Sequence, residues 1–168
     1  LEFRRVLFRS YPDGVVQQMR VAATCGLGAK YLARADARTA AVIGAGWQAA
    51  GQARAIAAVR KIERIRCFSP SVERRENFAK AMSAELGIEV TAAASVREAV
   101  RGADAIMCAT NSMQPVLSAE WIEPGMHISS LKRLELDAAV IAAADVVVTH
   151  SRGDATHLVR TKGADLAT

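Results

Sequence analysis

The stretch AVIGAGWQAAGQA, residues 41–53, constrains the fold of this chain more than any other. The segment TAAVIGAG predicts a short buried strand that ends in glycines, and the Ala- and Gln-rich residues Trp47–Arg60 that follow suit a helix. A strand, a tight glycine turn and a helix form one βα unit. We therefore expect an α/β fold.

The alternation of strand and helix continues along the chain. The expected strands are Ile65–Phe68, Glu89–Ala92, Asp104–Thr110, His127–Leu131 and Asp145–His150, and the expected helices are Val72–Leu86, Val96–Arg101 and Asp137–Ala144. The stretch 111–126 contains two prolines and is predicted to be irregular, with at most one helical turn. Strict βα alternation predicts a doubly wound, mainly parallel Rossmann sheet with flanking helices.

One further helix is expected ahead of the sheet, between Gly14 and Ala33. Apolar residues recur there at three- and four-residue spacing, which predicts a helix with a narrow buried face: Val16, Met19, Ala23, Leu27 and Tyr31. Gly26 and Gly28 in the same helix suggest close packing against a neighbour.

The first ten residues, LEFRRVLFRS, resemble the translation of a sequencing adapter and are excluded from the fold prediction. Removing their +2 charge lowers the formal net charge from +5 to +3, which is unremarkable. The alternative interpretation is a basic arm for nucleic acid or membranes, but three arginines without periodicity are weak evidence for one. We divide the remainder into a leading helix (11–36), a dinucleotide-binding Rossmann domain (37–152) and an incomplete C-terminal segment (153–168).

Composition narrows the class of protein further. Hydrophobic residues make up 51% and charged residues 23%, as in globular domains, and no apolar run is long enough to predict a membrane span. The three cysteines, Cys25, Cys67 and Cys108, are widely spaced and predict buried thiols in a reducing cytoplasm. The three histidines are too dispersed to predict a metal site: His127, His150 and His157.

The small residues of the glycine motif, G-x-G-x-x-A, each have a use in a dinucleotide site. Gly44 permits the tight turn, Gly46 lets the backbone approach a pyrophosphate, and Ala49 allows close packing of helix on strand. The helix N-terminus then faces the anion. The alternatives are a tight turn without a ligand and an S-adenosylmethionine site, but the latter usually needs an acid where Ser69 stands.

The segment CFSPSVERR after the second strand bears on the choice of cofactor. A site selective for NAD usually has an acid there, whereas this chain offers Ser69, Ser71, Arg74 and Arg75. Hydroxyl and guanidinium groups suit a 2′-phosphate, so we expect NADP in preference to NAD. The alternative is that both arginines lie on a solvated helix face.

Four stretches together resemble the ornithine cyclodeaminase and mu-crystallin family: MRVAATCGLGAKYLA, GAGWQAAGQ, CATNSMQPVL and PGMHIS. Gln48 within the glycine motif and Gln52 one turn later are the most telling, because ordinary dehydrogenase motifs do not require them. The resemblance covers residues 11–152. It implies a Rossmann domain of an NAD(P)-dependent enzyme acting on amino or imino acids, whose second domain, for substrate and homodimer formation, comes mainly from upstream sequence.

The resemblance also suggests site residues. It places Arg20 near the substrate carboxylate, and it places at the cofactor crevice a group of polar residues that follow two strands: Thr110, Asn111, Ser112, Ser129 and Ser130. The expected cofactor site consists of Gly44, Gly46, Gln48, Ala49, Ser69, Ser71, Arg75, Thr110, Asn111 and Ser129. Each has an ordinary alternative as a surface group or polar loop residue.

The segment HISSLKRLELD departs from the family, because the catalytic aspartate of cyclodeaminases has no counterpart there. Lys132 could polarise a carboxylate or move a proton on this short loop, or be an ordinary surface lysine. We therefore expect the cofactor-binding part of an oxidoreductase that reduces imines or ketimines or dehydrogenates amino acids. Cyclodeamination is less favoured. We expect this fragment to be inactive on its own. The alternative is a non-enzymatic NADPH-binding protein like mu-crystallin.

Overall fold

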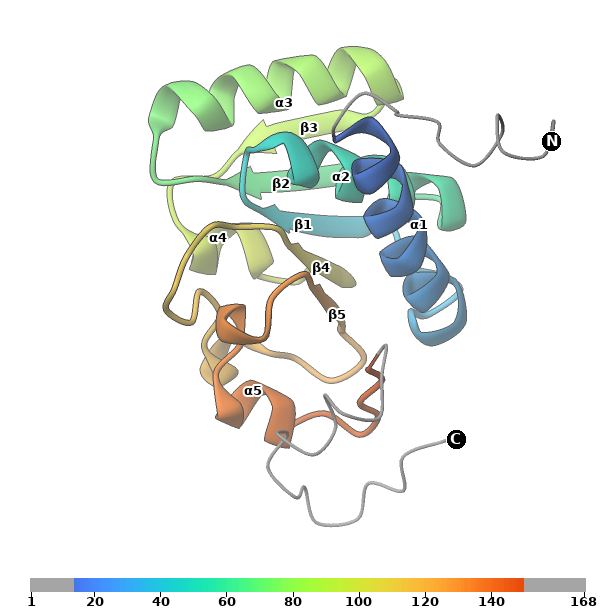
Figure 1. Ribbon diagram of the computed structural model, residues 1–168, viewed down its shortest axis with the longest axis vertical. Helices are drawn as coiled ribbons and strands as arrows, with labels where there is room; N and C mark the ends of the chain where they lie inside the picture. Colours follow the sequence, from blue (N-terminus) through green and yellow to red (C-terminus); the bar gives the residue numbers. More distant parts are fainter. Residues whose placement is uncertain (1–13, 150–168) are drawn as a thin grey trace, which may run out of the picture.

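The computed structural model describes residues 14–149 and contains a five-stranded sheet in which every strand pair is parallel (Figure 1). Its strands are β1 (Thr39–Ile43), β2 (Arg64–Phe68), β3 (Glu89–Ala92), β4 (Ala105–Cys108) and β5 (His127–Ser130). The order β3-β2-β1-β4-β5 means that the chain reverses direction across the sheet between β1 and β4. The predicted Rossmann-type α/β fold is confirmed.

Helices cover both faces of the sheet. They are α1 (Val15–Leu32), α2 (Trp47–Val59), α3 (Val72–Leu86), α4 (Val96–Val100) and α5 (Ala138–Ala142), with two 3₁₀ turns, η2 (Ala119–Trp121) and η3 (Arg133–Glu135). Alternate residues of β1 enter two cores: Val42 packs with α1, α2 and α3, and Ile43 packs with α4 and α5. The sheet is therefore doubly wound, and α3 and β3 have the predicted bounds.

The predicted sixth strand is wrong over residues 145–149, where the backbone is irregular and pairs with no strand. Val146 and Val148 are 61% and 64% exposed, so the apolar run DVVVT does not enter the core. β-branched residues favour a strand only where a neighbouring strand and a packed face receive them. His150, the last residue of the prediction, lies outside the described residues.

The predicted buried face of α1 is also wrong, because α1 contacts α2 through small residues. Its buried residues are Gly26 and Ala29. A Cβ on Gly26 would lie 3.3 Å from Ala55 Cβ, so the two helices approach closely, as expected there, whereas Gly28 has open space around it. The large apolar residues point outward: Val16, Met19, Leu27 and Tyr31 are all more than half exposed.

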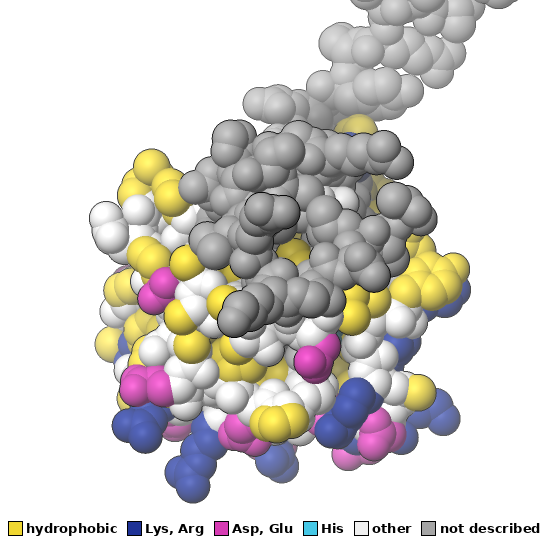
Figure 2. All heavy atoms as spheres, turned by 90° about the horizontal axis from the view of Figure 1, so that it is seen from below, with side chains coloured by type: hydrophobic (Ala, Val, Ile, Leu, Met, Phe, Trp, Pro, Cys, Tyr) yellow, Lys and Arg dark blue, Asp and Glu magenta, His cyan; other side chains and the backbone are white. Residues whose placement is uncertain are grey.

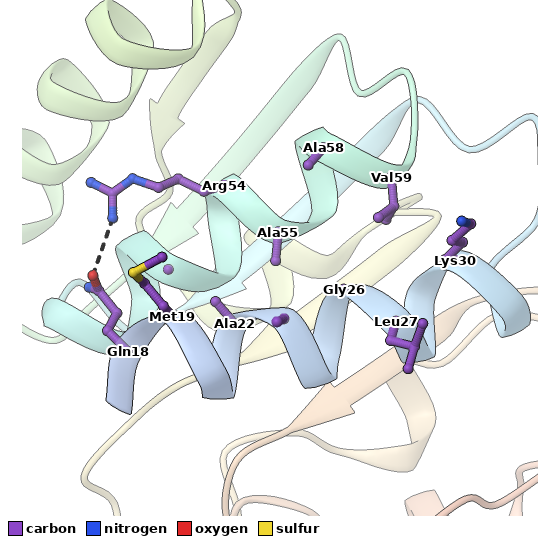
Figure 3. A pocket seen from close by; sticks show the side chains of 12 residues that line it. Gln18, Met19, Ala22, Gly26, Leu27, Lys30, Arg54, Ala55, Ala58 and Val59 are labelled. Carbon is purple, nitrogen blue, oxygen red and sulfur yellow. Dashed lines mark hydrogen bonds between the residues drawn. The ribbon is translucent and has the colours of Figure 1, made fainter. Parts of the chain in front are cut away.

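A groove of about 430 Å³ follows the outer contact between α1 and α2 (Figure 3). Met19, Leu27 and Ala55 line it, and Arg54 Nη1 donates to Gln18 Oε1 at one end. None of the predicted cofactor residues lines this groove.

The end of α1 is held by Arg60, which follows α2. Its guanidinium donates to three carbonyl oxygens: that of Lys30 in the last turn of α1 (2.8 Å), that of the C-cap Ala33 (2.6 Å) and that of Arg34 just beyond it (2.8 Å). These carbonyls lack partners within the helix. One side chain therefore satisfies the C-terminus of a neighbouring helix.

Asp104, directly before β4, organises the edge where the strands begin. Its carboxylate accepts hydrogen bonds from the backbone N–H of Arg38 (2.8 Å) and Thr39 (2.9 Å) and an ion pair from Arg34 (2.7 Å). Burial alone would raise the pKa of this carboxyl, but the two N–H donors and the charges of Arg34 and Arg38 outweigh it and lower the pKa. Asp104 thus fixes the start of β1 beside that of β4.

The surface seen from the α5 side carries charged side chains of both signs along one border (Figure 2). Apolar and neutral side chains make up most of the described surface that is visible away from this border. Among residues 14–149, no helix combines the length and apolarity that crossing a bilayer requires.

Candidate functional site

The glycine turn lies where the carboxyl ends of β1 and β4 meet. Gly44 has φ +120°, which favours glycine, and its N–H donates to Phe68 O at 2.8 Å. A Cβ at this position would lie 2.3 Å from Ala109 O, so the chain after β4 has no room for a side chain there. The tight turn predicted at Gly44 is therefore enforced by conformation and by packing.

Gly46, by contrast, borders open space. It is the N-cap of α2, and no atom lies within 4 Å of where its Cβ would be. The first turn of α2 has no side-chain cap and no acidic residue, so its N–H groups remain available to an anion. Ala49 is fully buried between α2 and the sheet, as its predicted packing role requires.

Gln48, in the first turn of α2, brings a polar group close to this turn. Its Oε1 is buried and has no hydrogen-bond partner among the described residues, whereas Gln52, one turn later, is buried within the protein. Buried amide groups are normally satisfied. The open space at Gly46, the uncapped helix and the unpartnered Gln48 together fit a polar, anionic ligand such as a dinucleotide.

The polar residues after β2 are brought together beside the turn. Ser71 Oγ accepts from Arg74 N (3.3 Å) as the N-cap of α3. Arg75 Nη1 donates to the carbonyl of the buried Ser69 (3.0 Å), and its guanidinium lies 5.8 Å from the Phe68 ring centroid. Arg74 is exposed. Ser71 and Arg75 thus support the local structure, and their role toward a cofactor stays a prediction.

The loops after β4 and β5 meet at Glu135, a residue that the sequence prediction missed. Its side chain is fully buried. One carboxylate oxygen accepts from Thr110 N (2.5 Å) and Thr110 Oγ1 (2.8 Å), and the other from Leu131 N and Lys132 N (both 3.0 Å), with Ser130 Oγ at 2.8 Å. The Thr110 hydroxyl is therefore turned toward Glu135.

The remaining predicted residues of this edge are partly or fully accessible. Asn111 is exposed and accepts a hydrogen bond from the exposed Lys132 Nζ at 3.4 Å. Ser129 Oγ lies 3.0 Å from Nε2 of the buried His127, whose pKa is lowered by burial and by the charge of Arg60. A cofactor role for Thr110, Asn111 and Ser129 stays a prediction.

Arg20 is not brought to these residues by any contact in the described part of the chain. Its side chain is exposed on α1 and forms no hydrogen bond or ion pair within residues 14–149. Its proposed role toward a substrate carboxylate therefore stays a prediction.

Burial disfavours the thiolate form of all three cysteines. Burial raises the pKa of Cys67 to about 11 and that of Cys108 further, with the charge of Glu135 adding to the effect on Cys108. Cys25 is only half-buried, and burial raises its pKa too. Among residues 14–149 no group of His, Cys, Asp and Glu side chains could hold a metal ion.

Comparison with known proteins identifies relatives with the same fold. The chain is 37% identical over 139 residues to a delta(1)-pyrroline-2-carboxylate reductase of Bacillus cereus, covering 80% of this chain and 42% of that protein. The structure of the Thermococcus litoralis enzyme of that name, in complex with NADH and L-proline, superimposes with a TM-score of 0.75 at 36% identity, covering 78% of this chain and 42% of that one.

A second solved structure is slightly less similar. The iminosuccinate reductase of Paracoccus denitrificans, in complex with NAD⁺, gives a TM-score of 0.71 at 32% identity and covers 79% of this chain and 42% of that one. The chain spans less than half the length of the curated relatives, 42% to 44% of those compared. The model of the ornithine cyclodeaminase/mu-crystallin family matches residues 13–158, and the chain belongs to that family.

Proposed function

We propose that this chain is the dinucleotide-binding portion of an NAD(P)-dependent oxidoreductase acting on amino or cyclic imino acids. The carrying observation is the turn Gly44–Gly46 at the point where the sheet reverses between β1 and β4. Ligands of open α/β sheets bind in the crevice outside the strand ends at such a point. We assign this role to residues 37–152, with the segment 11–36 as the preceding helix.

The cofactor, when bound, supplies or accepts the hydride. The chain's own residues hold and orient it. Gly46 and the first turn of α2 receive the pyrophosphate through backbone N–H groups, while Asn111 and Ser129, at the ends of β4 and β5, border the reactive side of the crevice. Arg20 is assigned to the substrate carboxylate because an arginine matches a carboxylate in charge and geometry.

The proposed substrate class rests on the family relatives. A related reductase acts on pyrroline-2-carboxylate by its name, and the Thermococcus enzyme was solved with L-proline. The segment HISSLKRLELD has no counterpart of the catalytic aspartate of cyclodeaminases, and this favours imine reduction over cyclodeamination of ornithine. A turnover screen of the full-length protein with pyrroline-2-carboxylate, alanine and ornithine tests this ranking, and fastest turnover of ornithine would reverse it.

Binding without turnover would support a different function. If the full-length protein binds NADPH tightly and reduces no imino acid, the non-enzymatic, mu-crystallin-like function holds instead. The full-length protein is also expected to be a homodimer in the cytoplasm, where free thiols such as Cys25 stay reduced. Light scattering checks the oligomeric state, and a monomer would contradict it.

A preference for NADP over NAD follows from the segment after β2. Ser69 stands directly after β2, where a site selective for NAD usually has a carboxylate, and Arg74 is exposed and available to bind a 2′-phosphate. We expect Arg74→Ala to raise the Kd for NADPH about tenfold and leave that for NADH nearly unchanged. Arg64→Ala, an exposed arginine at the opposite end of β2, is the matched control. Tighter binding of NADH than NADPH by the unaltered protein would refute the preference.

A further inference from the structure

Glu135 is a buried carboxylate without a cationic partner. Among the described residues no Lys, Arg or His nitrogen forms an ion pair with it, and its side chain is fully buried. An unpaired charge is costly to bury unless hydrogen bonds replace the lost water. The hydroxyl and backbone donors around Glu135 therefore replace the water that its carboxylate loses.

The hydrogen bonds of Glu135 come from two separate loops. Oε1 receives both donors of Thr110, on the loop that follows β4. Oε2 receives the backbone N–H groups of Leu131 and Lys132, on the loop that follows β5. A carboxylate can only accept, and here each oxygen serves one loop. The carboxylate therefore sets the spacing between the two loops.

These loops border the glycine turn. Ala109, which precedes Thr110, places its carbonyl against Gly44, and Leu131 N donates to Cys108 O (3.3 Å). A displacement of Thr110 would thus disturb the packing of this loop against Gly44. The Glu135 backbone is also fixed, because its carbonyl accepts from Val116 N at 2.9 Å.

We propose that Glu135 is a positioning residue that holds the loops after β4 and β5 in the arrangement needed to bind the dinucleotide. The inference rests on the proposed function for its ligand, but the link between the loops is a property of the unliganded protein. Glu135 touches neither cofactor nor substrate. It acts through Thr110 and the backbone of residues 131 and 132.

The test is Glu135→Gln in the full-length protein, with Asp104→Asn as the matched control. Glutamine keeps the shape but presents an NH₂ group to one set of N–H donors, so that loop is repelled, the link between the loops is broken and both become free to move. Asp104 likewise accepts two backbone N–H bonds, but it lies before β4, at the end opposite to Thr110. Loss of a charge-assisted bond is expected to raise the Kd for NADPH about tenfold in Glu135→Gln, but less than about twofold in Asp104→Asn.

Two further measurements separate positioning from a loss of stability. Both variants are compared at a temperature below their measured unfolding midpoints, and amide hydrogen exchange is followed in the absence of nucleotide. Exchange of Thr110 and of residues 131–132 is expected to accelerate together in Glu135→Gln only. Glu135→Asp keeps the charge, but its shorter side chain cannot reach both loops, so its Kd is expected to lie between the two.

Unchanged exchange at either loop in Glu135→Gln would overturn the proposal, as would wild-type NADPH affinity despite faster exchange. An equal weakening of NADPH binding in Asp104→Asn would overturn it too, because a general loss of stability would then explain both. If the unaltered protein bound no dinucleotide, the proposed function would fail, and the exchange data alone would still show whether Glu135 joins the loops.

Discussion

The two ends of β4 are organised by two carboxylates in opposite ways. Asp104, at the beginning of the strand, is partly exposed and has a cationic partner in Arg34, with 19% of its side chain accessible. Glu135, near the other end, is fully buried and relies on hydroxyl and backbone donors. A partly solvated ion pair tolerates small shifts, whereas a buried carboxylate whose donors are all fixed does not.

The difference between the two carboxylates corresponds to the different roles of the two edges of the sheet. The edge at Asp104 only joins α1, β1 and β4, so modest precision is sufficient there. The edge at Glu135 holds the loop after β4 against Gly44, next to the open space at Gly46 where the proposed dinucleotide would bind. Rigid contacts of this kind, made by residues that support a binding site without touching the ligand, keep the site within a fraction of an ångström of the geometry that binding requires.

The largest effect is expected from Gly44→Ala, at the carboxyl edge. The new Cβ would lie 2.3 Å from Ala109 O at φ +120°, so strain and overpacking combine to cost about 3 to 5 kcal/mol of unfolding free energy. Dinucleotide binding should be lost. Urea denaturation and NADPH titration measure both.

Gly87→Ala is the control for Gly44→Ala, since Gly87 also has positive φ (+67°) but has open space around it. It should cost only about 1 to 2 kcal/mol and leave NADPH binding unchanged. Equal losses at the two glycines would mean that backbone strain alone, without the β1–β4 contact, explains the result.

A smaller effect is expected from Asp104→Ala, at the amino edge. The backbone N–H groups of Arg38 and Thr39 lose their acceptor, which should cost about 2 to 3 kcal/mol of unfolding free energy. The Kd for NADPH should stay the same, because the crevice lies at the other edge. A weakened Kd would show that the two edges are coupled through β4.

The contribution of Asp104 should also depend on pH. Its folded pKa is lowered, so its stabilisation is fully present above the unfolded pKa of about 3.9 and is lost as pH falls through the folded value below it. The difference in unfolding free energy between the wild type and Asp104→Asn should therefore shrink only below about pH 4. Taking this difference cancels the separate titration of His127. A difference that is constant down to acid unfolding would contradict the assignment.

The smallest effect is expected from Lys132→Met, which removes the exposed link between the two loops. The Nζ–Asn111 contact is 3.4 Å long and solvated, so its loss should change the unfolding free energy by less than about 0.5 kcal/mol. The Kd for NADPH should change less than about twofold. A change as large as that of Glu135→Gln would mean that the exposed link and the buried one matter equally.

The sequence predicted the sheet better than it predicted what surrounds the sheet. Strands and helices such as β3 and α3 follow from local periodicity and caps, and Gly44 and Gly46 follow from the motif. The face of α1 was wrong because Gly26 and Ala29, small residues with little hydrophobic signal, form the contact with α2.

Glu135 was missed for a related reason. It stands in a 3₁₀ turn of three residues, where no periodicity indicates burial, and a lone glutamate among Lys132, Arg133 and Asp137 is usually solvated. Its donors come from residues up to 25 positions away, so only the folded chain assembles them. The partners proposed for Arg20 and Arg74 are ligands, so no contact within the folded chain corresponds to either prediction.

The hydrogen bonds from Arg60 to the end of α1 affect how this helix unfolds. A helix normally frays from a terminus whose carbonyls are satisfied by its own cap or by water. Here the last carbonyls of α1 depend on a guanidinium from the residue after α2. The final turn of α1 therefore unwinds only when its hydrogen bonds to Arg60 break. Because Arg60 caps α2 and lies 27 residues from Ala33 in the sequence, we expect the C-terminal ends of the two helices to unfold together.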